Sequence, residues 1–209
     1  MAEVLTLDEE SLQAEFYEAG WTDGLPIIAP TPERVEAMLA FADVDGEDPI
    51  GGVSSQQLVM TAGHAAVNAV MAGCEPAAFP IVLTALGAAL DPAFNLPVVC
   101  TSTGGAAICV AVSGPMAAKV GMHSAHNALG PRSRANATIG RAVRLAATNF
   151  LGSRVDGTDG TSLGHPGKYT FCFAEHEAAD LCPIRPNAWR SGVMRGHRYA
   201  GRHSRYGGL

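Results

Sequence analysis

Two consecutive alanine-rich segments in the first half of the chain limit its fold more than any other feature. They read QLVMTAGHAAVNAVMAG (57–73) and AAFPIVLTALGAAL (77–90), with Glu75 and Pro76 between them. Their apolar content predicts buried helices, and small side chains let two helix backbones approach closely. We therefore expect an internal helix pair, or a pair at a subunit contact, capped near Ser54 or Gln57.

Shorter periodic segments surround this pair. Further helices are expected at 6–19, 31–39, 115–121 and 136–151, strands at 96–102, 106–114 and 168–175, and an acidic loop at 42–52. Thr6 and Thr31 are the expected N-caps of the first two helices. The alternation is irregular and the chain is short enough for one core. We expect a single compact α/β or α+β domain over residues 1–182, with the alanine-rich helices packed on a small sheet.

Charge is distributed unevenly along the chain. Residues 1–182 contain eight Lys or Arg and twenty Asp or Glu, whereas residues 183–209 contain six Arg and no acidic residue. The basic end carries no recognisable motif for reading nucleic acid. We interpret 183–209 as an Arg/Gly-rich tail that is disordered or non-native, and we expect no nucleic-acid partner.

The cysteines and the apolar segments indicate where in the cell the protein is expected. The five cysteines are odd in number and form no CxxC pair, which is typical of reduced thiols. The N-terminal residues are acidic and amphipathic, unlike a secretory signal. The richest apolar run, 65–90, is interrupted by Asn68, Glu75 and two prolines. A cytoplasmic protein without a membrane span is therefore expected.

The segment GPRSRANATIGRA (130–142) gathers cationic and polar side chains where a helix begins. A helix N-terminus offers unpaired backbone N–H groups and the positive end of the helix dipole, so arginines placed there suit a carboxylate or phosphate. The alternative is that Asn136 caps the helix and the arginines bind neighbouring carbonyl groups or acidic side chains. The candidate substrate-binding residues are Asn127, Arg132, Arg134, Asn136, Thr138 and Lys168.

Cys74 is the candidate nucleophile. It lies between the two alanine-rich segments, where the N-terminus of the following helix would stabilise a thiolate. His64, His123 and His165 are the candidate acid–base groups. The competing interpretation is a small buried cysteine with histidines that serve only the core or the surface.

A metal centre is the second alternative. His123 and His126 would supply two of its ligands and Glu175 or His165 a third, although no HExxH pattern accompanies them. The chain would then be a metal-dependent hydrolase or lyase. No sequence fingerprint identifies an organic cofactor.

Several longer motifs, among them GWTDGLP, MAGCEP, RANATIGRA and GHPGKYTFCFAE, resemble a family of uncharacterised bacterial proteins over residues 20–177. Members are similar to proteins encoded beside UGSC-type (seleno)proteins, so the resemblance implies a thiol or selenol protein as partner. Family members continue into a further α/β segment where this chain has 183–209, and the resemblance therefore implies a truncated or out-of-frame end here.

The leading functional hypothesis is an enzyme that acts on a small anionic or carbonyl substrate through the Cys74 thiol. The main rival is a non-catalytic subunit, in a homo-oligomer or in complex with the thiol or selenol partner. An enzyme should bring Cys74, Arg134 and His165 around one cavity, whereas a binding subunit should not.

Overall fold

The computed structural model describes residues 8–154, 157–176, 192–195 and 198–200. Its α-helices are α1 (Glu9–Glu18), α2 (Pro32–Ala42), α3 (Ala62–Ala72), α4 (Phe79–Ala89), α5 (Leu96–Thr101), α6 (Pro115–Lys119) and α7 (Arg134–Leu151). Its strands are β1 (Pro49–Val53), β2 (Leu58–Thr61), β3 (Ile108–Val112), β4 (Cys172–Ala174), β5 (Gly192–Arg195) and β6 (Arg198–Ala200). Short 3₁₀ turns are η1 (Ser54–Gln56), η2 (Pro76–Ala78) and η3 (Pro166–Lys168).

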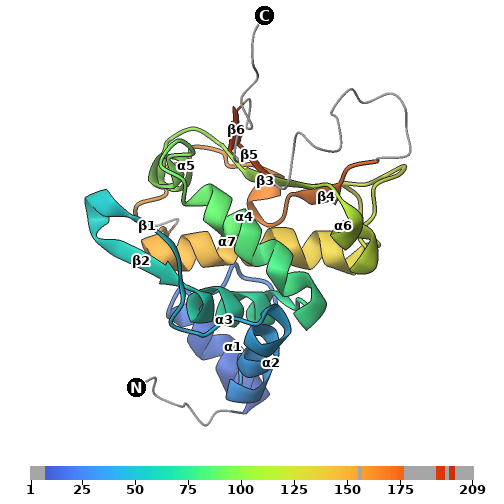
Figure 1. Ribbon diagram of the computed structural model, residues 1–209. Coiled ribbons are helices and arrows are strands. Elements are labelled where there is room, and N and C mark those ends of the chain that lie inside the picture. The colour runs from blue at the N-terminus through green and yellow to red at the C-terminus, as the bar shows by residue number, and fades with distance from the viewer. Residues whose placement is uncertain (1–7, 155–156, 177–191, 196–197, 201–209) are drawn as a thin grey trace, which may run out of the picture.

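The long helix α7 runs through the middle of the molecule, with α4 crossing it (Figure 1). The four-stranded sheet lies on one side of these two helices, and α3 lies on the other, followed by α1 and α2. The β1–β2 hairpin projects at the edge. This arrangement confirms the predicted α/β or α+β class; of the two alanine-rich helices, α4 lies against the larger sheet, whereas α7 separates α3 from it.

The larger sheet has the order β4-β3-β5-β6. Strands β3 and β4 are parallel, with Val110 opposite Cys172, and the other two pairings are antiparallel. Parallel neighbours require a long crossover connection. Here that connection contains α6, the loop that follows it, and α7.

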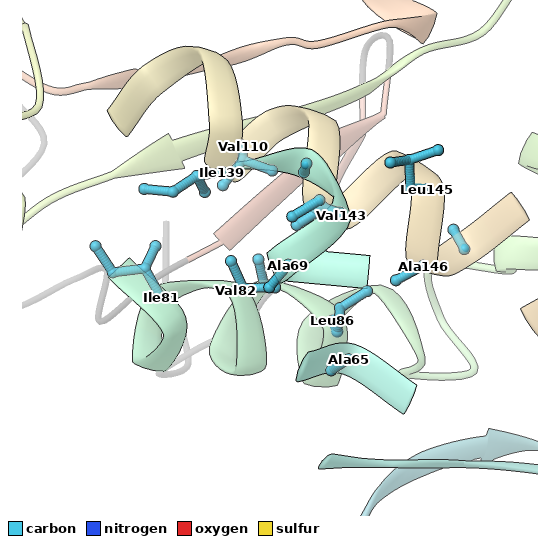
Figure 2. Close-up of a cluster of buried hydrophobic side chains, with 14 of the residues drawn as sticks. Ala65, Ala69, Ile81, Val82, Leu86, Val110, Ile139, Val143, Leu145 and Ala146 are labelled. Atoms are coloured by element: carbon cyan, nitrogen blue, oxygen red, sulfur yellow. The ribbon is translucent and has the colours of Figure 1, made fainter. Parts of the chain in front are cut away.

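The core forms where α3 and α4 meet α7. Ala65 and Ala69 of α3 are fully buried, as are Val143 and Ala146 of α7 (Figure 2). Alanines on α3 let its backbone come close to α7, while Leu86 and other larger side chains of α4 fill the remaining space. The predicted internal position of both alanine-rich helices is confirmed.

The first alanine-rich helix starts later than predicted. Residues 49–61 form the hairpin β1–β2, where we expected an acidic loop and the first helical turn. The strands exchange backbone hydrogen bonds, and the reversal is made by Gln57 in a left-handed conformation (φ 54°). Thr61 then caps α3 by accepting a hydrogen bond from the backbone N–H of His64, so the helix cannot begin at Ser54 or Gln57.

The predicted strand 96–102 is wrong, because this segment forms the helix α5. Its two adjacent valines suggested a strand. The buried residues are Leu96, Val99 and Cys100, which is the spacing of one helical face. Pro97 stands in the first turn, where its missing N–H is not needed. The strand predicted at 106–114 is present as β3, whereas that at 168–175 is reduced to β4.

Gly140 brings α7 against the chain that leads into β4. A Cβ at this position would lie 2.5 Å from Thr170 Oγ1 and 2.8 Å from the backbone nitrogen of Phe171. Real side chains do not reach such distances, so glycine is required for this close contact. The approach also lets the Thr170 hydroxyl donate to the carbonyl of Ala137 (2.8 Å).

The ends of the chain bear on three predictions. Thr31 caps α2 and Pro32 opens it, as predicted, but α1 is capped by Asp8, and Thr6 lies outside the described residues. The domain boundary at 182 and most of 183–209 also lie outside them, although β5 and β6 fall in that segment. Among the described residues, no helix is long and apolar enough to cross a membrane.

Candidate functional site

A pocket lies where the N-terminus of α7 meets η2 and the end of α6. Its volume is ≈ 140 Å³, enough for about four or five water molecules at roughly 30 Å³ each. The lining residues are Glu75, Ala77, Ala78, Val120, Gly121, Arg132, Ser133, Arg134, Ala135 and Thr138. Three predicted substrate-binding residues, Arg132, Arg134 and Thr138, are therefore brought together.

Helix α7 begins earlier than predicted, and this brings its first turn to the pocket. Ser133, not Asn136, is the N-cap: its hydroxyl accepts a hydrogen bond from the backbone N–H of Asn136 (3.2 Å). Asn136 therefore stands inside the first turn. The backbone N–H groups of Arg134 and Ala135 donate to no acceptor among the described residues, as expected for the first positions of a helix.

Asn136 has a positioning role in the loop that forms one side of the pocket. Its side chain is buried; the amide nitrogen donates to the carbonyls of His123 (2.9 Å) and Ala128 (3.1 Å). The amide oxygen accepts from the backbone N–H of His123 (3.0 Å) and from the Ser133 hydroxyl (2.9 Å). These bonds engage both ends of the amide, so Asn136 holds the loop in place and presents no group to the pocket.

The two pocket arginines differ in their partners. Arg134 donates to Glu75 Oε1 (2.8 Å) and to the carbonyl of Gly73 (3.3 Å), and both side chains of the Arg134–Glu75 ion pair are more than half exposed. Arg132 is also exposed and makes no hydrogen bond or ion pair with a described residue. Two cations and one carboxylate give the pocket a net positive charge.

Cys74 lies next to this pocket but does not line it. Burial raises the pKa of its thiol to about 12, against the smaller lowering effects of a hydrogen bond with Thr138 and of the Arg134 charge. The thiol is therefore protonated at neutral pH. The predicted thiolate is wrong, because burial in the core outweighs any stabilisation by neighbouring positive groups.

The candidate acid–base groups are dispersed. His64 completes the cap of α3, where its Nδ1 accepts from the backbone N–H of Thr61 (3.2 Å). It lies in the first turn of α3, whereas Cys74 follows the other end of the helix; the stretch from His64 to Ala72 alone spans about 12 Å along the axis. His165 accepts from the backbone N–H of Gly167 (2.9 Å) and stacks on Phe171. Neither histidine lines the pocket.

The alternative metal ligands do not assemble. His123 and His126 lie in a turn, where the His123 ring bonds the carbonyl of His126 (2.8 Å). A helix would have placed the two rings on one face, but this turn does not. No three His, Cys, Asp or Glu side chains within the described residues are grouped so that they could hold a metal ion. Asn127 adopts a left-handed conformation at the same turn and does not line the pocket.

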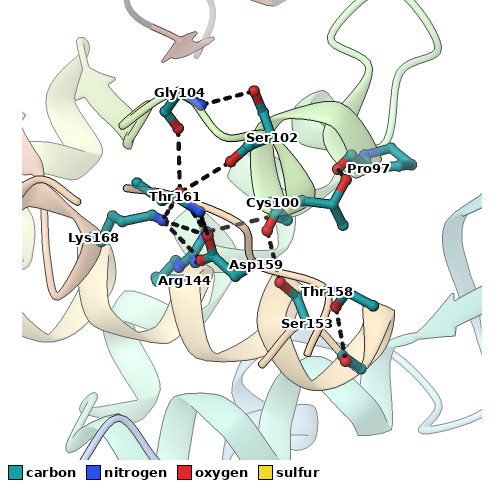
Figure 3. Close-up of polar contacts among 12 residues, drawn as sticks. Pro97, Cys100, Ser102, Gly104, Arg144, Ser153, Thr158, Asp159, Thr161 and Lys168 are labelled. Carbon is teal, nitrogen blue, oxygen red and sulfur yellow. Dashed lines mark hydrogen bonds and ion pairs between the residues drawn. The ribbon is translucent and has the colours of Figure 1, made fainter. Parts of the chain in front are cut away.

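A second polar cluster, centred on Asp159, was not predicted (Figure 3). Lys168 donates to both carboxylate oxygens of Asp159 (2.9 and 2.8 Å) and to the Thr161 hydroxyl (2.7 Å). These three bonds use every N–H of the ammonium group. Lys168, a predicted substrate-binding residue, is thus held within the protein and lies away from the pocket.

Arg144 supplies the second cation of this cluster. It donates to Asp159 Oδ2 (3.2 Å) and to the sulfur of Cys100 (3.4 Å). Burial tends to raise the pKa of Asp159, but hydrogen bonds from Lys168 and Thr161 outweigh it and lower the pKa overall. The carboxylate therefore stays ionised between two cations. Burial raises the pKa of the Cys100 thiol, which remains neutral.

The Asp159 cluster joins two loops. The Thr161 hydroxyl lies 3.1 Å and 3.2 Å from the carbonyl oxygens of Ser102 and Gly104, and the backbone N–H of Ser162 donates to Thr103. In the sequence, Asp159 stands before a glycine in a Gly/Ser/Thr-rich stretch, which is typical of a turn. No local signal distinguishes this buried aspartate from an exposed one.

Comparisons with known proteins supply no family for this chain. No protein-family model, no curated protein and no solved structure matches it.

Proposed function

We propose that this protein binds a small anionic compound in the pocket at the N-terminus of α7. The supporting observation is the pocket lining, which combines Arg132, Arg134 and the free N–H groups of the first helical turn with a single carboxylate, Glu75. Arginine donors and a helix N-terminus both favour carboxylate and phosphate groups.

The proposal is binding rather than thiol catalysis. An enzyme of the expected kind would place Cys74, Arg134 and His165 around one cavity, and only Arg134 lines this one. A thiol with a pKa of about 12 is also a poor nucleophile near pH 7, because the thiolate is the reactive form.

The test is an NMR titration of the ¹⁵N-labelled protein with sodium acetate and, separately, with inorganic phosphate. We expect shifts at Arg134 and Ala135, and a dissociation constant raised about tenfold by Arg132→Met, the loss of one charge-assisted hydrogen bond. Arg154→Met removes an exposed arginine beyond the opposite end of α7 and is the matched control, with an expected change below about twofold.

Two further results would test whether the pocket binds anions. Raising the salt concentration to about 0.5 M should weaken binding, because charges at an open site are screened. If neither anion shifts the Arg134 and Ala135 signals, or if Arg132→Met and Arg134→Met bind as tightly as the unaltered protein, the pocket is not an anion site.

A further inference from the structure

We infer that the pocket selects a small zwitterion, with an ammonium group close to a carboxylate, over an anion of the same size. This inference rests on the anion binding proposed above and names the class of ligand for the same pocket. It comes from the one acidic residue in the lining, Glu75, which a site for simple anions would not require.

The pocket presents both signs of charge. Glu75 uses only Oε1 to bind Arg134, and its Oε2 accepts no hydrogen bond from a described residue. Arg132 has no described partner either. A ligand carboxylate near Arg132 and the first turn of α7, with an ammonium group at Glu75 Oε2, would pair both groups at once.

The Arg134–Glu75 pair itself does not close the site. Both side chains are more than half exposed, at 61% and 64%, and exposed ion pairs of this kind are weak. Glu75 lines the same pocket as Arg132, so its carboxylate would repel a simple anion bound there. A zwitterion turns that repulsion into an attraction, because its ammonium group faces the carboxylate.

The remaining lining limits the size of the ligand. Ala77, Ala78, Val120 and Ala135 contribute small apolar side chains. With a volume of ≈ 140 Å³, the pocket holds a molecule of only a few heavy atoms besides its charged groups. Compounds of the size of the smallest amino acids fit this description.

The test compares ligands that differ only in the cationic group: glycine with glycolate, and alanine with lactate. Binding is followed by the NMR shifts of Arg134 and Ala135 in the unaltered protein and in Glu75→Gln. We expect glycine to bind at least tenfold more tightly than glycolate. In Glu75→Gln the preference should disappear, because glycine binds more weakly and glycolate more tightly.

Glu15→Gln is the matched control, since it removes one exposed carboxylate from α1 and changes the net charge equally. Its glycine-to-glycolate ratio should equal that of the unaltered protein. Equal affinities for the two members of each pair would overturn the zwitterion inference and leave the anion proposal standing. Absence of binding by all four compounds and by acetate and phosphate would overturn both.

Discussion

Helix α7 contributes an arginine to each of two charged clusters that behave differently. At its N-terminus Arg134 pairs with Glu75 in an open pocket, and the two side chains are 61% and 64% exposed. Further along, Arg144 pairs with Asp159 beneath two loops, and the exposures are 11% and 6%. The first cluster has donors and an acceptor that remain free among the described residues, whereas the carboxylate of the second is surrounded by donors.

The difference shows that burial, more than residue type, separates an ion pair that is open to solvent from one that is enclosed by the protein. Both clusters contain two cations and one carboxylate. In the pocket, the ions keep their hydration and can exchange partners with a ligand. Around Asp159 they have lost most of their water, so each ion depends on the others for stability.

Removal of the Asp159 carboxylate should have the largest effect. Asp159→Ala leaves Lys168 and Arg144 partly buried without their shared counterion, and we expect the free energy of unfolding to fall by about 3–5 kcal/mol, the range for a broken buried pair. Urea denaturation followed by circular dichroism measures the change. Glu15→Ala, on the exposed face of α1, is the control. If the free energy of unfolding falls by less than about 1 kcal/mol, as for an exposed ion pair, the two clusters do not differ in their contribution to stability.

Acid should weaken the Asp159 cluster next. Its folded-state pKa is lowered, so the stabilisation is complete above the unfolded-state pKa of about 3.9 and is lost as the pH falls through the lower folded-state value. We expect the free energy of unfolding to decline below about pH 4, and to decline less steeply in Asp159→Asn. Parallel pH profiles for the two proteins would contradict this expectation.

A substitution at the close contact of Gly140, one turn before Arg144, should reduce the free energy of unfolding by an intermediate amount. The Cβ of Gly140→Ala would meet the backbone of Phe171, and we expect a loss of about 1–3 kcal/mol despite the better helix propensity of alanine. In Gly87→Ala on α4, the added Cβ meets only Ile50, at 3.7 Å, so this control should be neutral or slightly stabilising. Equal stabilities of the two variants in urea would show that the contact at Gly140 relaxes easily.

The smallest effect is expected at the open pair. Arg134→Met removes an exposed ion pair and should change the free energy of unfolding by less than about 1 kcal/mol, while Arg144→Met should lose clearly more. Denaturation of both variants under the same conditions checks this. A larger loss from Arg134→Met than from Arg144→Met would reverse the assignment of structural and binding roles.

The fold was predictable where side-chain pattern and helix-ending signals agreed. The helix expected at 136–151 is present as α7: Ile139, Val143 and Ala146 recur at helical spacing and are buried, and Gly152 ends the helix in a left-handed conformation. The strand prediction for 96–102 was wrong because two valines favour strands locally. Asn95, as the N-cap, and contacts with the core stabilise a short helix there instead. Tertiary contacts overrode the local preference.

The site was predictable only in part. The dense polar segment near the start of α7 pointed to Arg132, Arg134 and Thr138, which line one pocket, and their role in binding a substrate stays a prediction. The segment did not show that Asn136 differs from the side chains that line the pocket, because its amide makes all its hydrogen bonds within the neighbouring loop. The candidate acid–base histidines lie far apart in the sequence, so their spacing could not predict whether they meet in the fold. Glu75 was not proposed as a site residue, because in the sequence it only marks the break between two helices.

The parallel pairing of β3 with β4 has one more consequence. Everything from Pro115 to Thr170, including α6, most of the pocket wall and the Asp159 cluster, belongs to one excursion of the chain that leaves the sheet and returns beside its starting strand. The returning chain packs against α7 at Gly140, where Thr170 and Phe171 lie close to the helix, so the docking of β4 and the docking of α7 are coupled. Any compound that binds the finished pocket must therefore favour the closed excursion over the open one, so occupancy of the pocket would slow hydrogen exchange in β4 as well as at the contact residues.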